Sequence, residues 1–212
     1  MNNSNTIALE CRSITKTFGS VVANKNINLS VKKGEILSIL GENGSGKTTL
    51  MNMISGIYFP DEGSIFVDGK EHFKLVDVFS GTENIVLGMR DKKFNIKKAQ
   101  KEIQETCDKY GFEIDLNKKI FDLSVSEKQT IEIVKVIYKG ADILILDEPT
   151  AVLTPQEITK LFNVLRKMRD DGKAIIIITH KLNEVLEISD RVSVLRKGEY
   201  IGTVETKTAT EQ

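Results

Sequence analysis

The sequence predicts an α/β fold, with a parallel sheet at its core, an antiparallel β subdomain beside that sheet and a small α-helical subdomain. The first observation is a glycine-rich loop at residues 41–48, which follows a predicted strand and precedes a predicted helix. The second is a pair of continuous apolar runs at residues 143–146 and 174–178, which is typical of strands covered on both faces. The third is the helix expected between those runs, because a strand–helix–strand order implies parallel strands with a right-handed crossover.

Three short strands are expected around the glycine-rich loop, at residues 7–14, 26–31 and 63–67. They flank the loop on both sides in the sequence, which predicts an antiparallel β layer beside the parallel core. Two more strands, at residues 191–195 and 199–204, are separated by a short turn and are expected to form a closing hairpin.

The helix between the two apolar runs has well-marked ends. Thr154 is the expected N-cap, Pro155 occupies the first helical position, and Glu157 completes a capping box. Gly172 is expected to end this helix. Two further helices are expected at residues 97–110 and 126–138.

The glycine-rich loop matches the phosphate-binding pattern G-x-x-x-x-G-K-[ST]. Its glycines let backbone N–H groups converge on phosphate oxygens, and the N-terminus of the following helix adds partial positive charge. Lys47 would reach the β- and γ-phosphates, and Thr48 would offer its hydroxyl to Mg²⁺. The alternative is a turn with an unrelated lysine, which the strand before it and the helix after it disfavour. The expected nucleotide-binding residues are Gly41, Glu42, Asn43, Gly44, Ser45, Gly46, Lys47, Thr48 and Thr49.

The apolar strand at residues 143–146 ends in two adjacent carboxylates, Asp147 and Glu148. Ligand sites in parallel sheets lie at the carboxyl ends of the strands, so both are expected beside the phosphate loop. Because successive strand residues point to opposite sides, we assign them different roles. Asp147 would hold Mg²⁺ through water, and Glu148 would polarise the water that attacks the γ-phosphate. The alternative is an acidic turn that only ends the strand.

Two further residues are candidates on weaker patterns. His180 ends the next apolar strand, and parallel strands would place it near the same sheet edge as Glu148. Its expected role is to sense the γ-phosphate, and a surface cap is the alternative. Phe18 follows the first strand, where an aromatic ring can either stack on adenine or pack in the core. Its spacing from Lys47 does not separate these two roles.

Composition excludes several classes of protein. The 212 residues carry 30 basic and 30 acidic side chains, and the resulting zero net charge disfavours a nucleic-acid partner bound through bulk charge. The two cysteines are far apart and are expected to be buried free thiols in a reducing compartment. No apolar run reaches the ~18 residues that a membrane-spanning helix needs, and no signal peptide is visible.

Taken together, these motifs resemble those of ATP-binding cassette (ABC) ATPases. The segment Leu-Ser-Val-Ser-Glu-Lys-Gln at residues 123–129 opens a helix between the phosphate loop and the acidic strand end. The order of phosphate loop, this signature segment, acidic strand end and strand-end histidine is the order found in that family. The resemblance covers nearly the whole chain. The patterns HFKLV at residues 72–76, ENIVLG at 83–88 and DEPTAVLT at 147–154 narrow it to the first cassette of importers for simple sugars and nucleosides.

The resemblance implies a role for each matched residue. Phe18 occupies the position of an adenine-stacking aromatic residue, and Val22 packs nearby. Asp147 matches the magnesium-side aspartate, Glu148 the catalytic glutamate and His180 the switch histidine. The signature residues, which would contact ATP held by a partner cassette, are Ser124, Val125, Ser126 and Glu127.

The resemblance also implies partners and a function. Two cassettes, fused or separate, would hold two ATP molecules with Mg²⁺ in a head-to-tail sandwich, and closure and reopening would drive membrane permease subunits. A solute-binding protein would take part indirectly. The expected function is therefore ATP hydrolysis that powers import of a simple sugar or nucleoside, at the cytoplasmic face of the cell membrane. No nucleic-acid partner is expected.

One nucleotide-binding domain is expected over residues 1–212. The β layer and phosphate-loop core would comprise about residues 1–71 and 140–212, and the helical subdomain and signature helix about residues 72–139. Because this subfamily usually fuses two cassettes, the chain could form the N-terminal half of a two-cassette protein.

Three departures from the family pattern stand out. The signature reads LSVSEKQ rather than LSGGQ, with Ser126 at the second glycine, and Thr154 replaces a common aspartate. No glutamine occurs between residues 50 and 99, where the family has one that ligates Mg²⁺ and senses the permease. A strand and that glutamine would lie between Glu71 and His72, so we expect about twenty residues to be absent at this junction, through a real deletion or a missing segment.

The departures keep a second class of function open. A nucleotide-binding regulatory or structural module with little turnover would tolerate both the altered signature and the absent glutamine. A third possibility is a soluble ABC protein of translation or DNA repair. The neutral charge and the absence of a long coiled-coil insertion speak against it.

Overall fold

A computed structural model describes residues 6–67, 80–86 and 95–208 of the chain. The chain divides into two compact units, one formed by residues 1–71, 142–151 and 165–212 and the other by residues 72–141 and 152–164. Residues 152–164, which were expected to belong to the phosphate-loop core, group here with the helical unit. The expected gap at the Glu71/His72 junction and the pattern at residues 72–76 lie outside the described residues.

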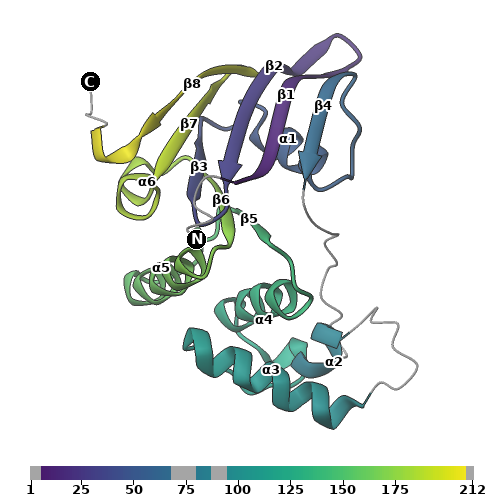
Figure 1. Ribbon diagram of the computed structural model, residues 1–212, viewed down its shortest axis with the longest axis vertical. Helices are drawn as coiled ribbons and strands as arrows, with labels where there is room; N and C mark the ends of the chain where they lie inside the picture. Colours follow the sequence, from purple (N-terminus) through teal and green to yellow (C-terminus); the bar gives the residue numbers. More distant parts are fainter. Residues whose placement is uncertain (1–5, 68–79, 87–94, 209–212) are drawn as a thin grey trace. The chain divides into compact units, whose positions relative to one another are not determined.

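The described part of the first unit contains eight strands in one sheet, in the order β4-β1-β2-β8-β7-β3-β6-β5 (Figure 1). The strands are β1 (Ile7–Phe18), β2 (Val21–Lys32), β3 (Ile36–Leu40), β4 (Glu62–Val67), β5 (Ile143–Asp147), β6 (Ala174–Thr179), β7 (Arg191–Arg196) and β8 (Glu199–Glu205).

The predicted parallel core is confirmed. Strand β3 lies between β6 and β7 and runs parallel to both, and β5 runs parallel to β6. The carboxyl ends of β3, β5 and β6 therefore meet at one edge of the sheet. The phosphate loop, the acidic pair and His180 follow these three strands in turn, which brings the candidate residues to that edge.

The predicted antiparallel layer is also confirmed, but it is continuous with the core. Strand β1 pairs antiparallel with both β2 and β4, and β7 and β8 form the expected hairpin. A single parallel residue pair, Lys25 with Glu199, joins β2 to β8 and so links the layer to the core strands.

Strands β1 and β2 are longer than the sequence analysis expected, because β1 runs to Phe18 and β2 starts at Val21. Polar contacts hold this extension. The Asp61 carboxylate accepts hydrogen bonds from the Thr17 N–H at 2.7 Å and from the Lys16 ammonium at 2.7 Å. Strand ends held by polar contacts show no alternation of apolar and polar residues. The hydrophobic pattern of the sequence therefore did not predict that β1 runs to Phe18 or that β2 starts at Val21.

The four predicted helices lie close to their expected positions, and two short helices, at residues 81–86 and 182–188, were not predicted. In the first unit are α1 (Lys47–Ile54) and α6 (Leu182–Ile188), and in the second are α2 (Gly81–Val86), α3 (Ile96–Tyr110) and α4 (Val125–Tyr138). Helix α5 spans Pro155–Asp170, and two short 3₁₀ helices cover Ile120–Asp122 and Thr206–Thr208. The capping box of α5 is confirmed, because the Thr154 N–H donates to the Glu157 carboxylate at 2.8 Å and the Glu157 N–H donates to the Thr154 hydroxyl at 3.4 Å.

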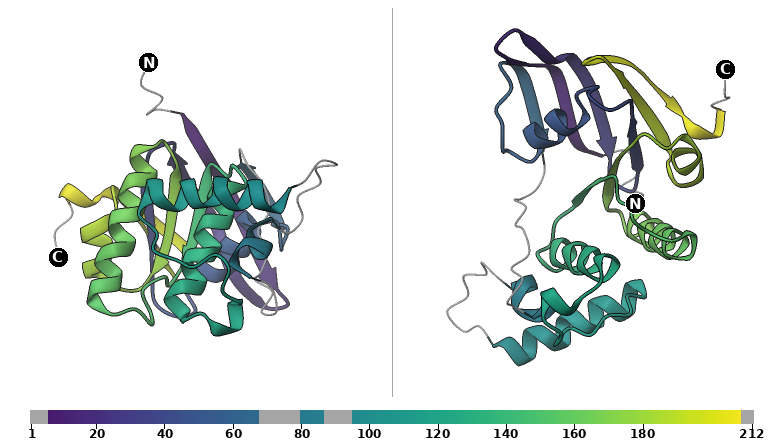
Figure 2. Two further views of the ribbon diagram at one scale, coloured as in Figure 1. Left: turned by 90° about the horizontal axis from the view of Figure 1, so that it is seen from below. Right: turned by 180° about the vertical axis from the view of Figure 1, so that it is seen from behind.

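Helices α2, α3 and α4 pack together in the second unit, as both views of Figure 2 show. Their shared core is apolar and fully enclosed, which explains why this group of short helices is compact. Its buried members are Ile85, Ile103, Cys107, Leu116, Ile120, Leu123, Ile131 and Val134. Among the helices of the described residues, none combines the length and apolar character that a membrane crossing needs.

Cys11 and Cys107 are free and buried, as predicted. Burial raises the pKa of Cys11 to about 12 and that of Cys107 to about 11. Because the thiolate is the reactive form, both thiols of the native protein should react with Ellman's reagent far more slowly than in guanidinium chloride. Rapid labelling of either thiol in the native protein would contradict the burial seen here.

Candidate nucleotide site

The phosphate loop connects β3 to α1, and Gly46 is the N-cap of α1 with φ 94° and ψ 2°. A Cβ atom at Gly46 would lie 2.3 Å from the carbonyl oxygen of Ala23, and one at Gly41 would lie 2.4 Å from that of Leu195. Both neighbours are backbone atoms, so they cannot swing away. The loop therefore needs glycine at both positions, which keeps its N–H groups accessible to phosphate oxygens.

Asn24 supports the loop from behind. It is fully buried, and its side-chain amide donates to the carbonyl oxygen of Gly46 at 3.2 Å. In the described structure, its Oδ1 atom and the buried hydroxyl of Ser45 have no hydrogen-bond partner. The sequence analysis missed Asn24, because its contact is with a residue 22 positions away and no local pattern indicates it.

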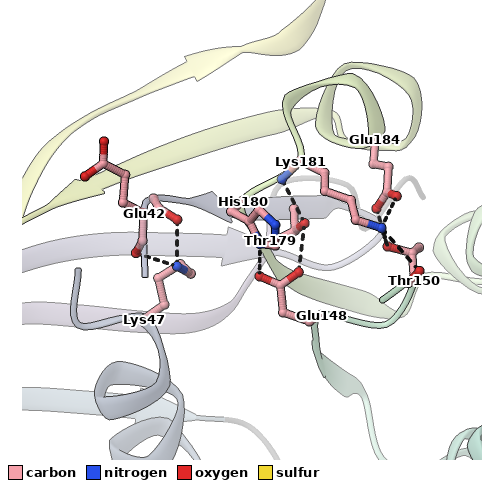
Figure 3. A network of polar contacts seen from close by, with 9 residues as sticks. Glu42, Lys47, Glu148, Thr150, Thr179, His180, Lys181 and Glu184 are labelled. Atoms are coloured by element: carbon pink, nitrogen blue, oxygen red, sulfur yellow. Dashed lines mark hydrogen bonds and ion pairs between the residues drawn. The ribbon is translucent and has the colours of Figure 1, made fainter. Parts of the chain in front are cut away.

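A pocket of about 330 Å³ opens in front of the loop. The Lys47 ammonium donates to the carbonyl oxygens of Gly41 at 2.6 Å and Glu42 at 2.8 Å, which holds it across the loop (Figure 3). Among the predicted residues of the phosphate loop, Gly41, Glu42 and Ser45 do not line the pocket, and His180 does not line it either. The pocket is lined by Val21, Val22, Ala23, Asn43, Gly44, Gly46, Lys47, Thr48, Thr49, Asp147 and Glu148.

Asp147 and Glu148 both line this pocket, although strand alternation predicts that they point to opposite sides. The physical reason is that the strand ends at Asp147, and Glu148 has a left-handed backbone with φ 45°. Burial and, secondarily, the Glu148 carboxylate raise the pKa of Asp147, whereas the Lys47 ammonium opposes this shift. The pocket thus gathers two carboxylates and one ammonium group.

His180 lies beside Glu148. Its Nδ1 atom is 2.7 Å from one carboxylate oxygen of Glu148, and the Thr179 hydroxyl donates to the other at 3.4 Å (Figure 3). The backbone N–H of Glu148 also donates to the carbonyl oxygen of Ile178 at 2.8 Å. The structure therefore brings the two predicted catalytic residues together by pairing β5 with β6.

Phe18 ends β1 with 45% of its surface exposed, and it does not line the pocket. Phe18 pairs across the β1–β2 hairpin with Val21, and Val21 lines the pocket. The Phe18 ring therefore belongs to the strand pair that forms one wall of the pocket. Tyr58 contacts the ring edge to face, with centroids 5.5 Å apart. Adenine stacking on Phe18 stays a prediction.

The pocket suits a magnesium ion bound together with phosphate. The Thr48 hydroxyl and the Asp147 carboxylate are hard oxygen ligands and line the same pocket. Magnesium in phosphate sites usually takes one or two protein ligands and completes its shell with phosphate and water. No cluster of three or more histidine, cysteine or acidic side chains that could hold a metal ion occurs in the described ranges.

The signature residues lie in the second unit at the start of α4. Ser124 is the N-cap, its hydroxyl accepts from the Glu127 N–H at 3.2 Å, and its own N–H donates to the Glu127 carboxylate at 2.8 Å. Ser124 and Glu127 thus form a capping box, which explains both residues locally. Val125 is 61% exposed and is available for an external contact.

The glycine cradle, the lysine, the strand-end carboxylates and the parallel sheet define a nucleotide-binding protein of the P-loop class. The chain belongs to the ABC transporter family, because the family model described as ABC transporter matches residues 24–151. Nucleotide binding follows from this membership.

Two similar curated proteins are import ATP-binding proteins. The chain is 45% identical over 230 aligned positions to the nucleoside import ATP-binding protein NupA of Lactococcus lactis, covering 98% of this chain and 46% of that protein. It is 47% identical over 221 positions to the guanosine import ATP-binding protein NupO of Bacillus subtilis, covering 94% and 43%. The chain spans less than half the length of these relatives.

Solved structures agree on the fold. The chain matches MJ0796, a bacterial ABC transporter cassette solved as a dimer, with a TM-score of 0.81 and 25% identity. The match covers 93% of this chain and 98% of that cassette.

The alignment to NupA also bears on chain length. Since 98% of the 212 residues is about 208, about 22 of the 230 aligned positions have no counterpart in this chain. This number is close to the roughly twenty residues expected to be absent, through a deletion or a missing segment.

Proposed function

We propose that the chain is an ATP-hydrolysing cassette that powers import of a small solute, a nucleoside in preference to a sugar, through a membrane permease. The observation that carries the proposal is the Glu148 carboxylate 2.7 Å from His180, in a pocket that the phosphate loop and Asp147 also line. This arrangement supports a role for Glu148 as the base and for His180 as its polar partner beside the γ-phosphate of bound ATP.

Different residues of the chain bind the phosphates, activate the attacking water and hold the metal ion. Loop N–H groups and Lys47 bind the phosphates, and Glu148 orients the attacking water and accepts its proton. His180 holds the Glu148 carboxylate on one side. Thr48 and Asp147 would hold Mg²⁺, which when bound neutralises charge on the phosphate oxygens.

Partners and location belong to the same proposal. The exposed start of α4, including Val125, would contact ATP held by a second cassette in a head-to-tail pair. The complex would sit at the cytoplasmic face of the cell membrane, on permease subunits. Support for a nucleoside comes from the names of NupA and NupO, which state nucleoside and guanosine import.

A module with little turnover is the second candidate. Ser126 in the signature and the unmatched alignment positions favour it, because either could weaken hydrolysis without abolishing binding.

Phosphate release from ATP separates the two candidates. For the cassette, release should stop on chelation of Mg²⁺ with EDTA and should rise more steeply than linearly with protein concentration, because two chains complete each site. ATP binding with background turnover, even in native membranes with the permease, would support the low-turnover module. Loss of guanosine uptake but not ribose uptake on gene deletion would identify the solute class.

A further inference from the structure

A second polar cluster joins the segment that follows Glu148 to the segment that follows His180. The Lys181 ammonium donates to the backbone carbonyl of Thr150 at 3.2 Å, to the Thr150 hydroxyl at 3.1 Å and to the Glu184 carboxylate at 3.0 Å. The Thr150 hydroxyl in turn donates to the other Glu184 oxygen at 2.5 Å. Figure 3 shows the three side chains converging next to the Glu148–His180 contact.

The cluster is sheltered at its centre. Thr150 is only 2% exposed, the Glu184 side chain is 15% exposed and the Lys181 side chain is 34% exposed. Because the buried Thr150 hydroxyl both donates and accepts a hydrogen bond, its position is fixed by two partners. An exposed ion pair, in contrast, contributes little to stability. Thr150 is thus the member whose loss should matter most.

The position of Glu148 depends on contacts that cross between β5 and β6. Strand β5 is at the end of the described sheet, and Glu148 leaves it with a left-handed backbone. Beyond Glu148, the cluster joins the turn at Thr150 to the start of α6. Thr179 continues the connection, because its hydroxyl accepts from the Lys181 N–H at 3.1 Å and donates to Glu148.

We propose that Lys181, Thr150 and Glu184 are positioning residues, which we call the clamp, that set the distance between the Glu148 carboxylate and the His180 imidazole. The clamp touches neither the pocket nor the reacting atoms, and it acts by fixing two backbone turns relative to each other. The effect of the clamp on turnover rests on the proposed role of Glu148 as the base. Its effect on the distance between Glu148 and His180 is independent of that role.

The test compares Thr150→Val with Thr150→Ser. Valine keeps the shape and removes the hydroxyl, whereas serine keeps the hydroxyl. Lys181→Met provides a second, independent break of the clamp if the valine variant folds poorly. A misplaced base should lower kcat about tenfold to a hundredfold in Thr150→Val and Lys181→Met, with KM for ATP within about twofold. Thr150→Ser should restore kcat.

A second readout reports geometry without hydrolysis. The chain has only two histidines, so ¹⁵N-histidine labelling gives a resolvable imidazole spectrum in which His180 is assigned from the His180→Gln variant. Glu148→Gln should shift the His180 signals in the native background, because it changes the group 2.7 Å away. In Thr150→Val this shift should largely disappear, and in Thr150→Ser it should return.

The outcomes separate the clamp from the proposed function. Unchanged kcat in an active protein, or a His180 response to Glu148→Gln that survives in Thr150→Val and Lys181→Met, would overturn the clamp. Absence of ATP turnover in the wild-type protein would overturn the proposed function, while the imidazole response would still decide the clamp.

Discussion

Replacing Glu148 with glutamine is expected to lower ATP turnover about 10²–10⁴-fold, the loss typical of removing a general base. ATP binding should persist, because the phosphate loop and Lys47 supply the main phosphate contacts and are unchanged. The amide keeps the size of the side chain but cannot accept a proton from water. The loss should therefore appear in kcat and leave the dissociation constant of ATP nearly unchanged, as measured by phosphate release and calorimetry.

A matched control is available in the same unit. Glu187 is an acid on α6 whose side chain is 56% exposed and pairs with Arg166 at 3.5 Å. Exposed ion pairs of this kind contribute little, so Glu187→Gln should keep wild-type turnover. Equal turnover in Glu148→Gln and Glu187→Gln would remove Glu148 from the role of base.

Replacing Gly46 with alanine is expected to distort the phosphate loop and to weaken ATP binding strongly. The left-handed backbone of Gly46 costs an alanine about 1–2 kcal/mol. Its Cβ atom would also lie 2.3 Å from the Ala23 carbonyl oxygen and 2.6 Å from the Asn24 amide, and such overpacking adds about 1–3 kcal/mol. Binding should weaken by at least about tenfold, since 1.4 kcal/mol corresponds to that factor.

The Gly44→Ala variant separates the effect of backbone strain from the effect of close contact. Its φ is 80°, but a Cβ atom there would meet nothing within 4 Å. Gly44→Ala should therefore show only the backbone strain, with a smaller fall in melting temperature and a smaller loss of ATP affinity than Gly46→Ala. If Gly44→Ala and Gly46→Ala lose the same amount of ATP affinity, close contact with Ala23 and Asn24 does not determine the conformation of the loop.

The departures in the signature do not alter these two expectations. Ser124 and Glu127 are accounted for by the capping box of α4, so their side chains stabilise the start of the helix whatever the partner cassette does. In the proposed pair of cassettes Ser126 would contact ATP held by the partner, whereas Glu148 and Gly46 line the pocket of this chain.

Much of the fold and the centre of the site could be predicted from the sequence, because their signals are local. A phosphate loop needs its glycines, lysine and threonine at fixed spacing, and Lys47 and Thr48 do line the pocket. Apolar runs predicted β5 and β6, and parallel pairing at one sheet edge predicted that His180 would approach Glu148.

Only the tertiary structure decided the supporting contacts. Asn24 beneath Gly46, the Thr150–Lys181–Glu184 clamp and the extension of β1 held by Asp61 all join residues that are far apart in the sequence. Their partners depend on which strands are neighbours and on the register between them, and that leaves no periodic pattern to detect. The left-handed turn that brings Glu148 into the pocket with Asp147 likewise follows from how the chain leaves β5. The sequence by itself thus determined which side chains are the candidate site residues, and the packing of distant segments decided how they are held.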